Sequence, residues 1–549
     1  MLTGAEAMIH ALEKEGVQHI FGYPGATIAP FYDALIQSDI KHILVRHEQH
    51  AGHAASGYAR VSGKPGVCVV TSGPGATNLI TALATAYMDS IPIIAISGQV
   101  DSNLLGRDVF QEADITGATE PFTKYSYLVK DAADIPRIFK EAFHIASTGR
   151  PGPVLIDIPV DLQTDKAAMH FPDEVHLRGY NPTIKGHPGQ VKRLVKEIRK
   201  AKRPILCVGG GVFNSHAEQN LAAFIDKAGI PTVCTLMGIG AVPTDSPLFM
   251  GQVGMHGDNL ANEALSHADI LILMGARVSD RAMMLPDKIK RKTKIIHVDI
   301  DPAEIGKNLD TYLPVVGDLN TILGQLLEYE VPEQVKLNRE EWTKNLHDKA
   351  ALMLTDETVR SGTVNPKAFA KELSKKLGDN YIYCQDVGQN QLWSAGNIEV
   401  RKGCKFLTTG GMGTMGYSIG AAVGARFATI EDGTQNARTV IAVCGDGSFQ
   451  MCMMELATIV QQGLDVKVIV MRNGKLGLVR EIQDKSYYGH HSEIDLTGSP
   501  DPALIAKAYG IDAYQASDID TALGHVDKML SSTRPALLVI NVPDDESSL

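Results

Sequence analysis

The chain has 549 residues, a net charge of −11 and 44% hydrophobic residues. This acidic balance disfavours nucleic acid or an anionic membrane as the main partner, and no stretch approaches the roughly 20 apolar residues of a membrane-spanning helix. The length predicts about three or four domains of about 150 residues each.

The N-terminal segment, residues 1–16, predicts an amphipathic helix that carries Glu and Lys, and not a signal peptide. Seven cysteines are scattered without metal-binding spacing, mostly in or beside apolar segments. They indicate reduced packing residues of a cytoplasmic protein.

Apolar segments that predict strands recur along the whole chain, each followed by a small or polar turn and a helix. In the first third they span residues 18–23, 42–48, 66–73, 92–98 and 152–159, and a polar stretch around 164–190 ends the run. The middle third offers 203–211, 230–236, 269–276 and 294–301. A charged segment, 338–365, leads to the last third, with 381–388, 405–411, 439–444, 466–471 and 535–543. This alternation predicts an α/β protein with three doubly wound parallel sheets.

A nicotinamide site in the middle third is disfavoured. The sequence VGGGVFNS (208–215) offers Gly209 and Gly211, but Asn214 stands where the dinucleotide fingerprint needs its third glycine.

Two polar residues end neighbouring strands in the last third. The runs 439–444 and 466–471, with helical spacing between them and a helix end at Gly463, predict one βαβ unit. Asp446 and Asn473 should then both lie at the carboxyl edge of a parallel sheet, where ligands bind. Two ordinary turns are the alternative, but two oxygen ligands at this edge suit Mg²⁺, with phosphate supplying further oxygens.

Four motifs together resemble the thiamine-diphosphate enzymes of the pyruvate oxidase and decarboxylase group. They are FGYPGA (21–26), RHEQ (46–49), TSGPGATN (71–78) and the G-D-G of 445–447 that is followed by Asn473. Further motifs look like the acetohydroxyacid synthases, also called acetolactate synthases: FQEADI (110–115), GMHG (254–257), ARVSDR (276–281), HVDIDPAEIGKN (297–308), DVGQNQ (386–391) and LGLVREIQ (476–483). The resemblance runs essentially end to end.

The resemblance implies a domain order and a reaction. A pyrimidine-binding domain (1–165) and a diphosphate-binding domain (365–549) would flank a central FAD-type domain (190–330). The enzyme would decarboxylate pyruvate and join the two-carbon unit to pyruvate or 2-oxobutyrate, the first common step of branched-chain amino-acid synthesis. One cofactor would be bound through its diphosphate by the third domain and through its pyrimidine by the first domain of a neighbouring subunit. A homodimer or a dimer of dimers is therefore implied, and a small regulatory subunit is left open.

The resemblance also assigns residues. Glu48 would act at the pyrimidine N1′, Phe110 and Gln111 would border the reacting centre, and Arg281 would meet the acceptor's carboxylate. Metal ligands would be Asp446, Asn473 and the carbonyl of Lys475. Thiamine diphosphate would also contact Gly25, Thr71, Asn78, Val387, Gly388, Gln389, Asn390, Gly413, Met415, Gly447 and Ser448. FAD, without a redox role in turnover, would contact Arg150, His256, Gly257, Gly275, Arg277, Asp299 and Asp318.

Three positions depart from the family's pattern. Val160 replaces a Lys, Asn390 replaces a His, and Ile482 replaces a Trp of the acceptor pocket. Val160 leaves another acetyl-transferring carboligase of the same group open, and one alternative is an FAD-using oxidase or a simple decarboxylase, which FQE (110–112) and ARVSDR (276–281) disfavour. A non-catalytic flavoprotein scaffold is a second alternative, which the presence of Glu48, Asp446 and Asn473 disfavours.

Overall fold

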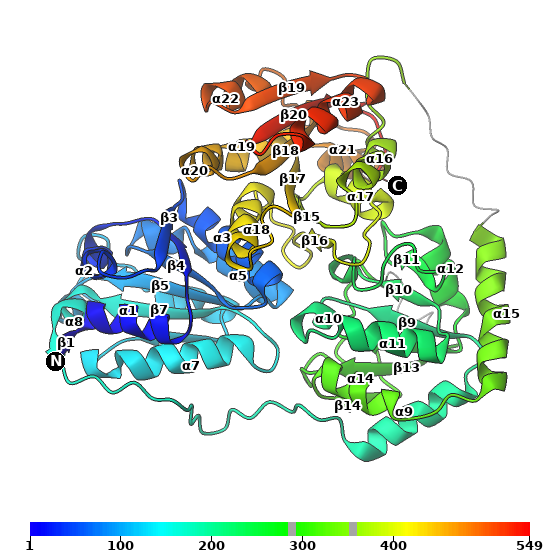
Figure 1. Ribbon diagram of the computed structural model, residues 1–549, viewed down its shortest axis with the longest axis horizontal. Coiled ribbons are helices and arrows are strands. Elements are labelled where there is room, and N and C mark those ends of the chain that lie inside the picture. Colours follow the sequence, from blue (N-terminus) through cyan, green and yellow to red (C-terminus); the bar gives the residue numbers. More distant parts are fainter. Residues whose placement is uncertain (284–291, 351–359, 549) are drawn as a thin grey trace. The chain divides into compact units, whose positions relative to one another are not determined.

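The computed structural model describes residues 1–283, 292–350 and 360–548. These residues form two compact units (Figure 1). Unit 1 contains residues 1–180, 381–390 and 407–544, and unit 2 contains the described parts of 181–380, 391–406 and 545–549. The first and last thirds of the chain therefore share one unit, and most of the middle third lies in the other.

The N-terminal sheet has six parallel strands in the order β3-β2-β4-β5-β7-β6. Its strands are β2 (His19–Gly22), β3 (Lys41–Leu44), β4 (Gly66–Val70), β5 (Ile93–Gln99), β6 (Tyr125–Leu128) and β7 (Val154–Pro159). A separate two-stranded antiparallel pair joins β1 (Leu2–Thr3) to β8 (Lys166–Ala167).

Helices pack on both faces of this sheet. One core lies under α1, α2 and α7, and the other lies under α3 and α5. The helix α1 begins with reciprocal caps, because the Thr3 hydroxyl accepts the Glu6 N–H at 3.2 Å and the Glu6 carboxylate accepts the Thr3 N–H at 2.7 Å. The helical bounds are α1 (Gly4–Lys14), η1 (Ala26–Ile28), α2 (Ala29–Leu35), α3 (Glu48–Ser62), α4 (Pro74–Thr77), α5 (Ile80–Asp89), η2 (Ser102–Leu104), α6 (Ile115–Thr119), η3 (Glu120–Phe122), η4 (Ala132–Asp134), α7 (Ile135–Ser147) and α8 (Val160–Thr164).

The C-terminal sheet repeats the topology of the N-terminal one. Its order is β16-β15-β17-β18-β20-β19, so both sheets read 2-1-3-4-6-5 when their strands are numbered along the chain. The strands are β15 (Tyr381–Gln385), β16 (Lys405–Leu407), β17 (Thr439–Gly445), β18 (Val466–Arg472), β19 (Asp512–Ala516) and β20 (Ala536–Asn541). The helices are α17 (Gln389–Asn397), α18 (Ser418–Glu431), α19 (Asp446–Cys452), η6 (Met453–Glu455), α20 (Leu456–Gln461), α21 (Gly477–Ser486), α22 (Pro502–Ala508) and α23 (Ile519–Leu530).

The helices α3 and α18 join the two sheets of unit 1 by close packing of small residues. A methyl group on Gly57 of α3 would lie 2.0 Å from the carbonyl oxygen of Ala421, and one on Gly424 of α18 would lie 1.8 Å from that of Ala54. One hydrophobic core runs through this contact, with side chains from both sheets. The two halves of unit 1 are therefore packed backbone against backbone.

The central sheet, in unit 2, has a different order, β11-β10-β9-β12-β13-β14. Numbered along the chain this is 3-2-1-4-5-6, the order of dinucleotide-binding folds. Its strands are β9 (Pro204–Val208), β10 (Thr232–Cys234), β11 (Phe249–Gln252), β12 (Ile270–Met274), β13 (Lys294–Asp299) and β14 (Leu313–Val316). The helices of this region are α9 (Pro188–Lys200), α10 (Gly211–Asn214), α11 (Glu218–Ala228), η5 (Leu236–Gly238), α12 (Asn259–His267), α14 (Leu319–Leu327), α15 (Glu333–Ala350) and α16 (Pro366–Leu377).

The fold confirms the predicted α/β class and its parallel sheets. Besides the short pair β1 and β8, it adds to the six-stranded sheets four strands that the apolar pattern did not predict: β6, β11, β14 and β19. All four lie at an edge of their sheet. Edge strands are covered less completely than central ones, so they need no continuous apolar run. The sequences YSYL of β6 and DAYQA of β19 show this, since most of their residues are partly exposed.

Two other predicted features differ in detail. The single helix expected after Asp446 is divided by the 3₁₀ turn η6 into α19 and α20. The charged segment 338–365 is helical up to Ala350, and its residues 351–359 lie outside the described residues.

All seven cysteines are buried and free, as predicted. Within the described part of the chain, no helix combines the length and the apolar character that crossing a membrane requires.

Candidate active site

The carboxyl edge of the N-terminal sheet gathers several predicted residues. Gly25 follows β2, Glu48 opens α3 after β3, and Thr71 follows β4 directly. A methyl group on Gly25 would lie 2.5 Å from Cβ of Thr71, so these two turns touch. The parallel order of β3, β2 and β4 thus brings together three residues that lie far apart in the sequence.

Glu48 is held by a side chain from the TSGPGATN turn. Asn78 Nδ2 donates to Glu48 Oε2 at 2.9 Å. The other carboxyl oxygen, Oε1, lies 3.4 Å from the position that a methyl group on Gly75 would take. The structure therefore brings the predicted pair Glu48 and Asn78 into direct contact and leaves little room beside Oε1 for a larger residue at position 75.

A second part of this edge is the loop of residues 106–114, which carries Phe110 and Gln111. The Phe110 side chain is 86% exposed. Gln111 has a φ of +58°, and its backbone lies against Gly73, where a methyl group would be 3.0 Å from Cα of Gln111. The loop is thus placed against the TSGPGATN turn, and the roles of Phe110 and Gln111 stay predictions.

The C-terminal sheet places Asp446 and Asn473 at its carboxyl edge, as predicted. Asp446 begins α19 after β17, Asn473 follows β18, and Gly445 is in register with Met471. The Gly474 N–H donates to Asp446 Oδ2 at 2.8 Å, and the Lys475 N–H donates to Asn473 Oδ1 at 3.1 Å. The two turns are therefore tied to each other through the candidate ligands.

Asp446 is in an environment that favours a bound cation. Its side chain is 7% exposed, and burial raises the pKa of its carboxyl, while the N–H groups of Gly474 and Gly447 lower it. A buried carboxylate is costly unless it is paired or coordinates a metal. Across the described residues no group of three or more His, Cys, Asp or Glu could hold a metal, so a metal here depends on Asp446 with amide and carbonyl oxygens.

The turn after β15 lies next to Asp446. Ser448 Oγ donates to the carbonyl of Val387 at 3.1 Å. Both side-chain polar atoms of Asn390 are buried without a hydrogen-bond partner among the described residues, and Asn390 Nδ2 lies 3.3 Å from the position of a methyl group on Gly445. A buried amide beside a helix N-terminus, with no protein partner, fits an anionic group such as a phosphate.

Gln389 links this turn to Asn473. Asn473 Nδ2 donates to Gln389 Oε1 at 3.0 Å, and Gln389 Nε2 donates to Glu481 Oε1 at 2.5 Å. Because the Asn473 side-chain nitrogen donates a hydrogen bond to Gln389, the amide oxygen of Asn473 faces the N–H of Lys475.

One residue of this edge was not predicted from the sequence. Asp386 is fully buried and accepts the N–H groups of Val387, Gly416 and Ser418, each at 2.9 Å. Burial raises the pKa of its carboxyl, and these donors lower it. Asp386 fixes the end of β15 to the turn that carries Gly413 and Met415. The sequence signal that could have indicated Asp386 is an acidic residue directly after the apolar run YIYCQ (381–385).

Met415 lies against the turn that begins α19. Its Cε atom is 3.5 Å from the position of a methyl group on Gly447. Met415 is therefore close to the residue that directly follows Asp446, and its role toward the cofactor stays a prediction.

The predicted FAD residues of unit 2 lie around the carboxyl edge of the central sheet. A methyl group on Gly211 would lie 2.6 Å from Cα of Gly275, and the Gly211 N–H donates to the Gly275 carbonyl at 3.0 Å. These two turns follow β9 and β12, the strands at which the order reverses, which is where such sheets bind dinucleotides. His256, Gly257 and Arg277 lie in turns of the same unit, Asp299 ends β13, and Asp318 caps α14. Arg150 belongs to unit 1.

A cavity of about 200 Å³ lies at the carboxyl ends of β10 and β11. Cys234, Gln252 and Asp258 line it, and Gln252 Oε1 is buried without a hydrogen-bond partner among the described residues. Because Asp258 directly follows the GMHG motif, this cavity adjoins the predicted FAD residues.

Arg281 lies in unit 2, where its side chain is exposed and its Nη1 contacts the sulfur of Met255 at 3.1 Å. Its role toward an acceptor therefore stays a prediction.

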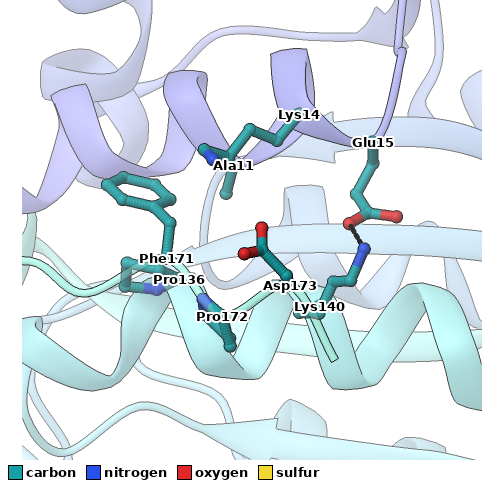
Figure 2. A pocket seen from close by; sticks show the side chains of 8 residues that line it. All are labelled: Ala11, Lys14, Glu15, Pro136, Lys140, Phe171, Pro172 and Asp173. Atoms are coloured by element: carbon teal, nitrogen blue, oxygen red, sulfur yellow. Dashed lines mark hydrogen bonds and ion pairs between the residues drawn. The ribbon is translucent and has the colours of Figure 1, made fainter. Parts of the chain in front are cut away.

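A pocket in unit 1 lies away from all of these residues. It is between α1 and α7 and has a volume of about 120 Å³ (Figure 2). Lys140 donates to Glu15 at 2.8 Å across it, and Asp173 points between the two helices. Its lining contains none of the residues predicted for catalysis or for cofactor binding.

Three family models match the chain in succession. The N-terminal TPP binding domain of thiamine pyrophosphate (thiamine diphosphate) enzymes matches residues 2–118, their central domain matches residues 191–326, and their C-terminal TPP binding domain matches residues 386–540.

Curated relatives match over the full chain. The sequence is 43% identical to the probable acetolactate synthase large subunit of Methanocaldococcus jannaschii, over 100% of this chain and 93% of the relative. It is 44% identical to the acetolactate synthase of Arthrospira platensis, over 99% and 95%. It is 42% identical to the acetolactate synthase large subunit of Corynebacterium glutamicum, over 99% and 87%.

Proposed function

The chain belongs to the acetolactate synthase family of thiamine-diphosphate enzymes, and we propose that it joins the two-carbon unit of decarboxylated pyruvate to a second 2-oxo acid. Pyruvate as acceptor gives 2-acetolactate, and 2-oxobutyrate gives 2-aceto-2-hydroxybutyrate. The observation that carries the proposal is identity of 42–44% with these synthases along essentially the whole chain.

We assign the pyrimidine half of the cofactor to residues 1–165, with Glu48 at its centre. Thiamine diphosphate, when bound, supplies a thiazolium carbon that stabilises a carbanion. Glu48 would hold a proton at the pyrimidine N1′ and would thereby favour the tautomer that can act as a base toward this carbon. The Asn78 amide occupies Glu48 Oε2, so we assign Oε1 to the cofactor, with Gly25 and Thr71 beside it.

We assign the diphosphate half to residues 365–549, with Mg²⁺ on Asp446, Asn473 and the Lys475 carbonyl. Hard oxygen ligands of this kind suit Mg²⁺, which keeps open positions for phosphate oxygens. The buried Asp446 carboxylate and the unpartnered Asn390 amide fit a cation and an anion at adjacent positions. Val387, Gly388, Gln389, Gly413, Met415, Gly447 and Ser448 would complete this half.

We assign FAD to residues 190–330. The 3-2-1-4-5-6 strand order and the close glycine turns at its switch point support a dinucleotide, although the glycine fingerprint is incomplete at Asn214. His256, Gly257, Gly275, Arg277, Asp299 and Asp318, with Arg150, would contact it.

Phe110 and Gln111 would border the reacting centre, and Arg281 would meet the acceptor's carboxylate. An aromatic side chain and an amide suit a small 2-oxo acid at the reacting centre, and a guanidinium matches its carboxylate in a bidentate manner.

We propose that the working unit is at least a homodimer. The names of the relatives that are called large subunits support a separate small subunit here as well. The seven buried, free cysteines are consistent with the reducing cytoplasm, where we place the protein.

One experiment tests the reaction. The purified protein, supplied with thiamine diphosphate, Mg²⁺ and FAD, is incubated with pyruvate, with and without 2-oxobutyrate, while oxygen uptake is followed. We expect 2-acetolactate in the first case, both acetohydroxy acids in the second, and no oxygen uptake coupled to turnover. Acetaldehyde as the main product, or one oxygen consumed for each pyruvate, would instead indicate a decarboxylase or an oxidase.

A further inference from the structure

The loop of residues 106–114 is closed on itself by a carboxylate. The Glu112 side chain accepts the N–H groups of Gly106 and Val109, the latter at 3.1 Å, and the Glu112 N–H donates to the Val109 carbonyl at 3.0 Å. These backbone donors lower the pKa of Glu112. The loop therefore has a fixed internal shape, but its position on the sheet needs a separate attachment.

Gln99, the last residue of β5, provides that attachment. Its Nε2 donates to the Ala113 carbonyl at 2.8 Å and to Asp157 Oδ2 at 2.9 Å, and its Oε1 accepts the Val100 N–H at 2.9 Å. Both amide hydrogens face acceptors and the amide oxygen faces a donor, so the amide cannot be turned over without losing all three bonds. Gln99 is 3% exposed, which excludes water as an easy substitute.

Asp157, on the neighbouring strand β7, fixes the orientation of Gln99. It is 1% exposed and accepts Ser97 Oγ at 2.6 Å as well as Gln99 Nε2. Burial raises the pKa of Asp157 to about 7, while the Ser97 and Gln99 bonds lower it and the nearby Asp114 raises it. A buried carboxyl is costly, and here it presents acceptor oxygens to both donors at once.

The chain of contacts ends at the reacting centre. Ala113 is two residues from Gln111, whose backbone rests on Gly73 with no space for a methyl group at position 73. A shift of Ala113 would therefore move Gln111 and Phe110 relative to the TSGPGATN turn. A displacement of about 1 Å at such a position can lower a rate by about a hundredfold.

We propose that Gln99 and Asp157 are positioning residues, which hold the loop of residues 106–114 through the Ala113 carbonyl so that Phe110 and Gln111 keep their place at the reacting centre. This inference rests on the proposed function, because it uses the assigned roles of Phe110 and Gln111. Neither Gln99 nor Asp157 touches a substrate.

Two variants break the contact in different ways. Gln99→Met keeps the length of the side chain but removes every donor. Gln99→Glu places a second carboxylate against Asp157 and the Ala113 carbonyl. In both we expect kcat for acetolactate formation to fall by about tenfold or more, while the affinity for thiamine diphosphate, measured by fluorescence quenching, stays within about twofold of the wild-type value.

A double variant separates positioning from simple loss of stability. Asp157→Asn combined with Gln99→Glu returns a donor to the pair, because an amide nitrogen can then face the new carboxylate. The Ala113 carbonyl still faces a carboxylate in this double variant, so we expect the free energy of unfolding to recover toward the wild-type value while kcat stays within about twofold of that of Gln99→Glu. Ser102→Ala serves as the control. Ser102 lies between β5 and the loop and its hydroxyl donates to Asp161, not to the loop, so this substitution should leave kcat near the wild-type value.

Three results would overturn the inference: wild-type kcat in both Gln99 variants, recovery of kcat in the double variant, or loss of cofactor affinity in parallel with kcat. Failure of the proposed function is distinguishable, because the wild-type protein itself would then form no acetolactate.

Discussion

Asp446 is the residue whose substitution tests the metal site most directly. In the site that we propose, Asp446→Ala would remove the one anionic protein ligand from a cation that also neutralises the diphosphate. We expect Mg²⁺-dependent binding of thiamine diphosphate, measured by isothermal titration calorimetry, to fall below detection while the fold is retained. Asp512→Asn, at an exposed position of the edge strand β19, is the control and should bind normally. Normal cofactor affinity in Asp446→Ala would show that Asp446 is not a ligand of the metal.

Glu48 makes a different prediction, because its assigned role is proton transfer and not affinity. Glu48→Gln keeps the shape of the side chain and an oxygen that can accept from Asn78 Nδ2. We expect cofactor affinity to change little, while exchange of the thiazolium C2 hydrogen for deuterium in the bound cofactor slows by about a hundredfold or more. An unchanged exchange rate, followed by quenched-flow NMR, would show that the assignment is wrong.

Ile482 tests the acceptor pocket. It lies on α21 with its side chain 48% exposed, where the family has a Trp that packs against the extra methyl of 2-oxobutyrate. One methylene in an apolar pocket is worth about 1–3 kcal/mol, so the smaller Ile should give weaker preference for 2-oxobutyrate over pyruvate. In competition assays with both acceptors, we expect Ile482→Trp to raise the share of acetohydroxybutyrate. An unchanged or lower share would mean that neighbours such as Leu478 already fill the space.

At the scale of elements, the contact between α3 and α18 makes a stability prediction. Gly424→Ala would place a methyl group 1.8 Å from the Ala54 carbonyl oxygen, which forces the two helices apart. We expect the free energy of unfolding of unit 1, measured by urea denaturation, to fall by about 3 kcal/mol or more. Gly524→Ala, in the middle of α23 with no atom within 4 Å of the new methyl group, is the matched control and should stabilise by about 0.5–1 kcal/mol. Equal effects of the two substitutions would contradict the close packing.

The central strands could be predicted from the sequence because burial on both faces imposes an apolar run, as in TVIAVC of β17. Four of the six edge strands of these sheets could not, because a half-covered strand needs no continuous apolar run, and β6, for example, carries polar residues. The other two, β3 and β16, do contain apolar runs and could be predicted. The same limit applies to the site. Asp446 and Asn473 end apolar runs, and topology alone then places them together. The contact between Gln99 and Ala113, and the role of Asp386, depend on how loops pack, and no periodicity in the sequence encodes that packing.

At the scale of the whole molecule, the residues predicted to bind thiamine diphosphate and its metal divide between the two sheets that share one topology. Glu48 belongs to the N-terminal sheet and Asp446 to the C-terminal one. In the assembly that we propose, each cofactor is held by Glu48 of one chain and Asp446 of another. Glu48→Gln should then impair the pyrimidine half of a site, and Asp446→Ala should impair the diphosphate half.

This assembly predicts complementation between two inactive variants. In a dimer of one Glu48→Gln chain and one Asp446→Ala chain, one site carries both substitutions and the other carries neither. Random mixing makes about half of the dimers mixed, so we expect about a quarter of the wild-type activity from two inactive preparations. If each site were built within a single chain, the mixture would recover no activity.

The reverse mixture is a second experiment, in which wild-type chains are mixed equally with chains that carry both substitutions. Every site of a mixed dimer is then damaged, so we expect about a quarter of the wild-type activity to remain. Sites built within single chains would instead retain about half of it. Differently tagged chains, co-purified before the assay, establish that mixing has occurred, so an absence of complementation in such a sample would show that each chain builds its own site.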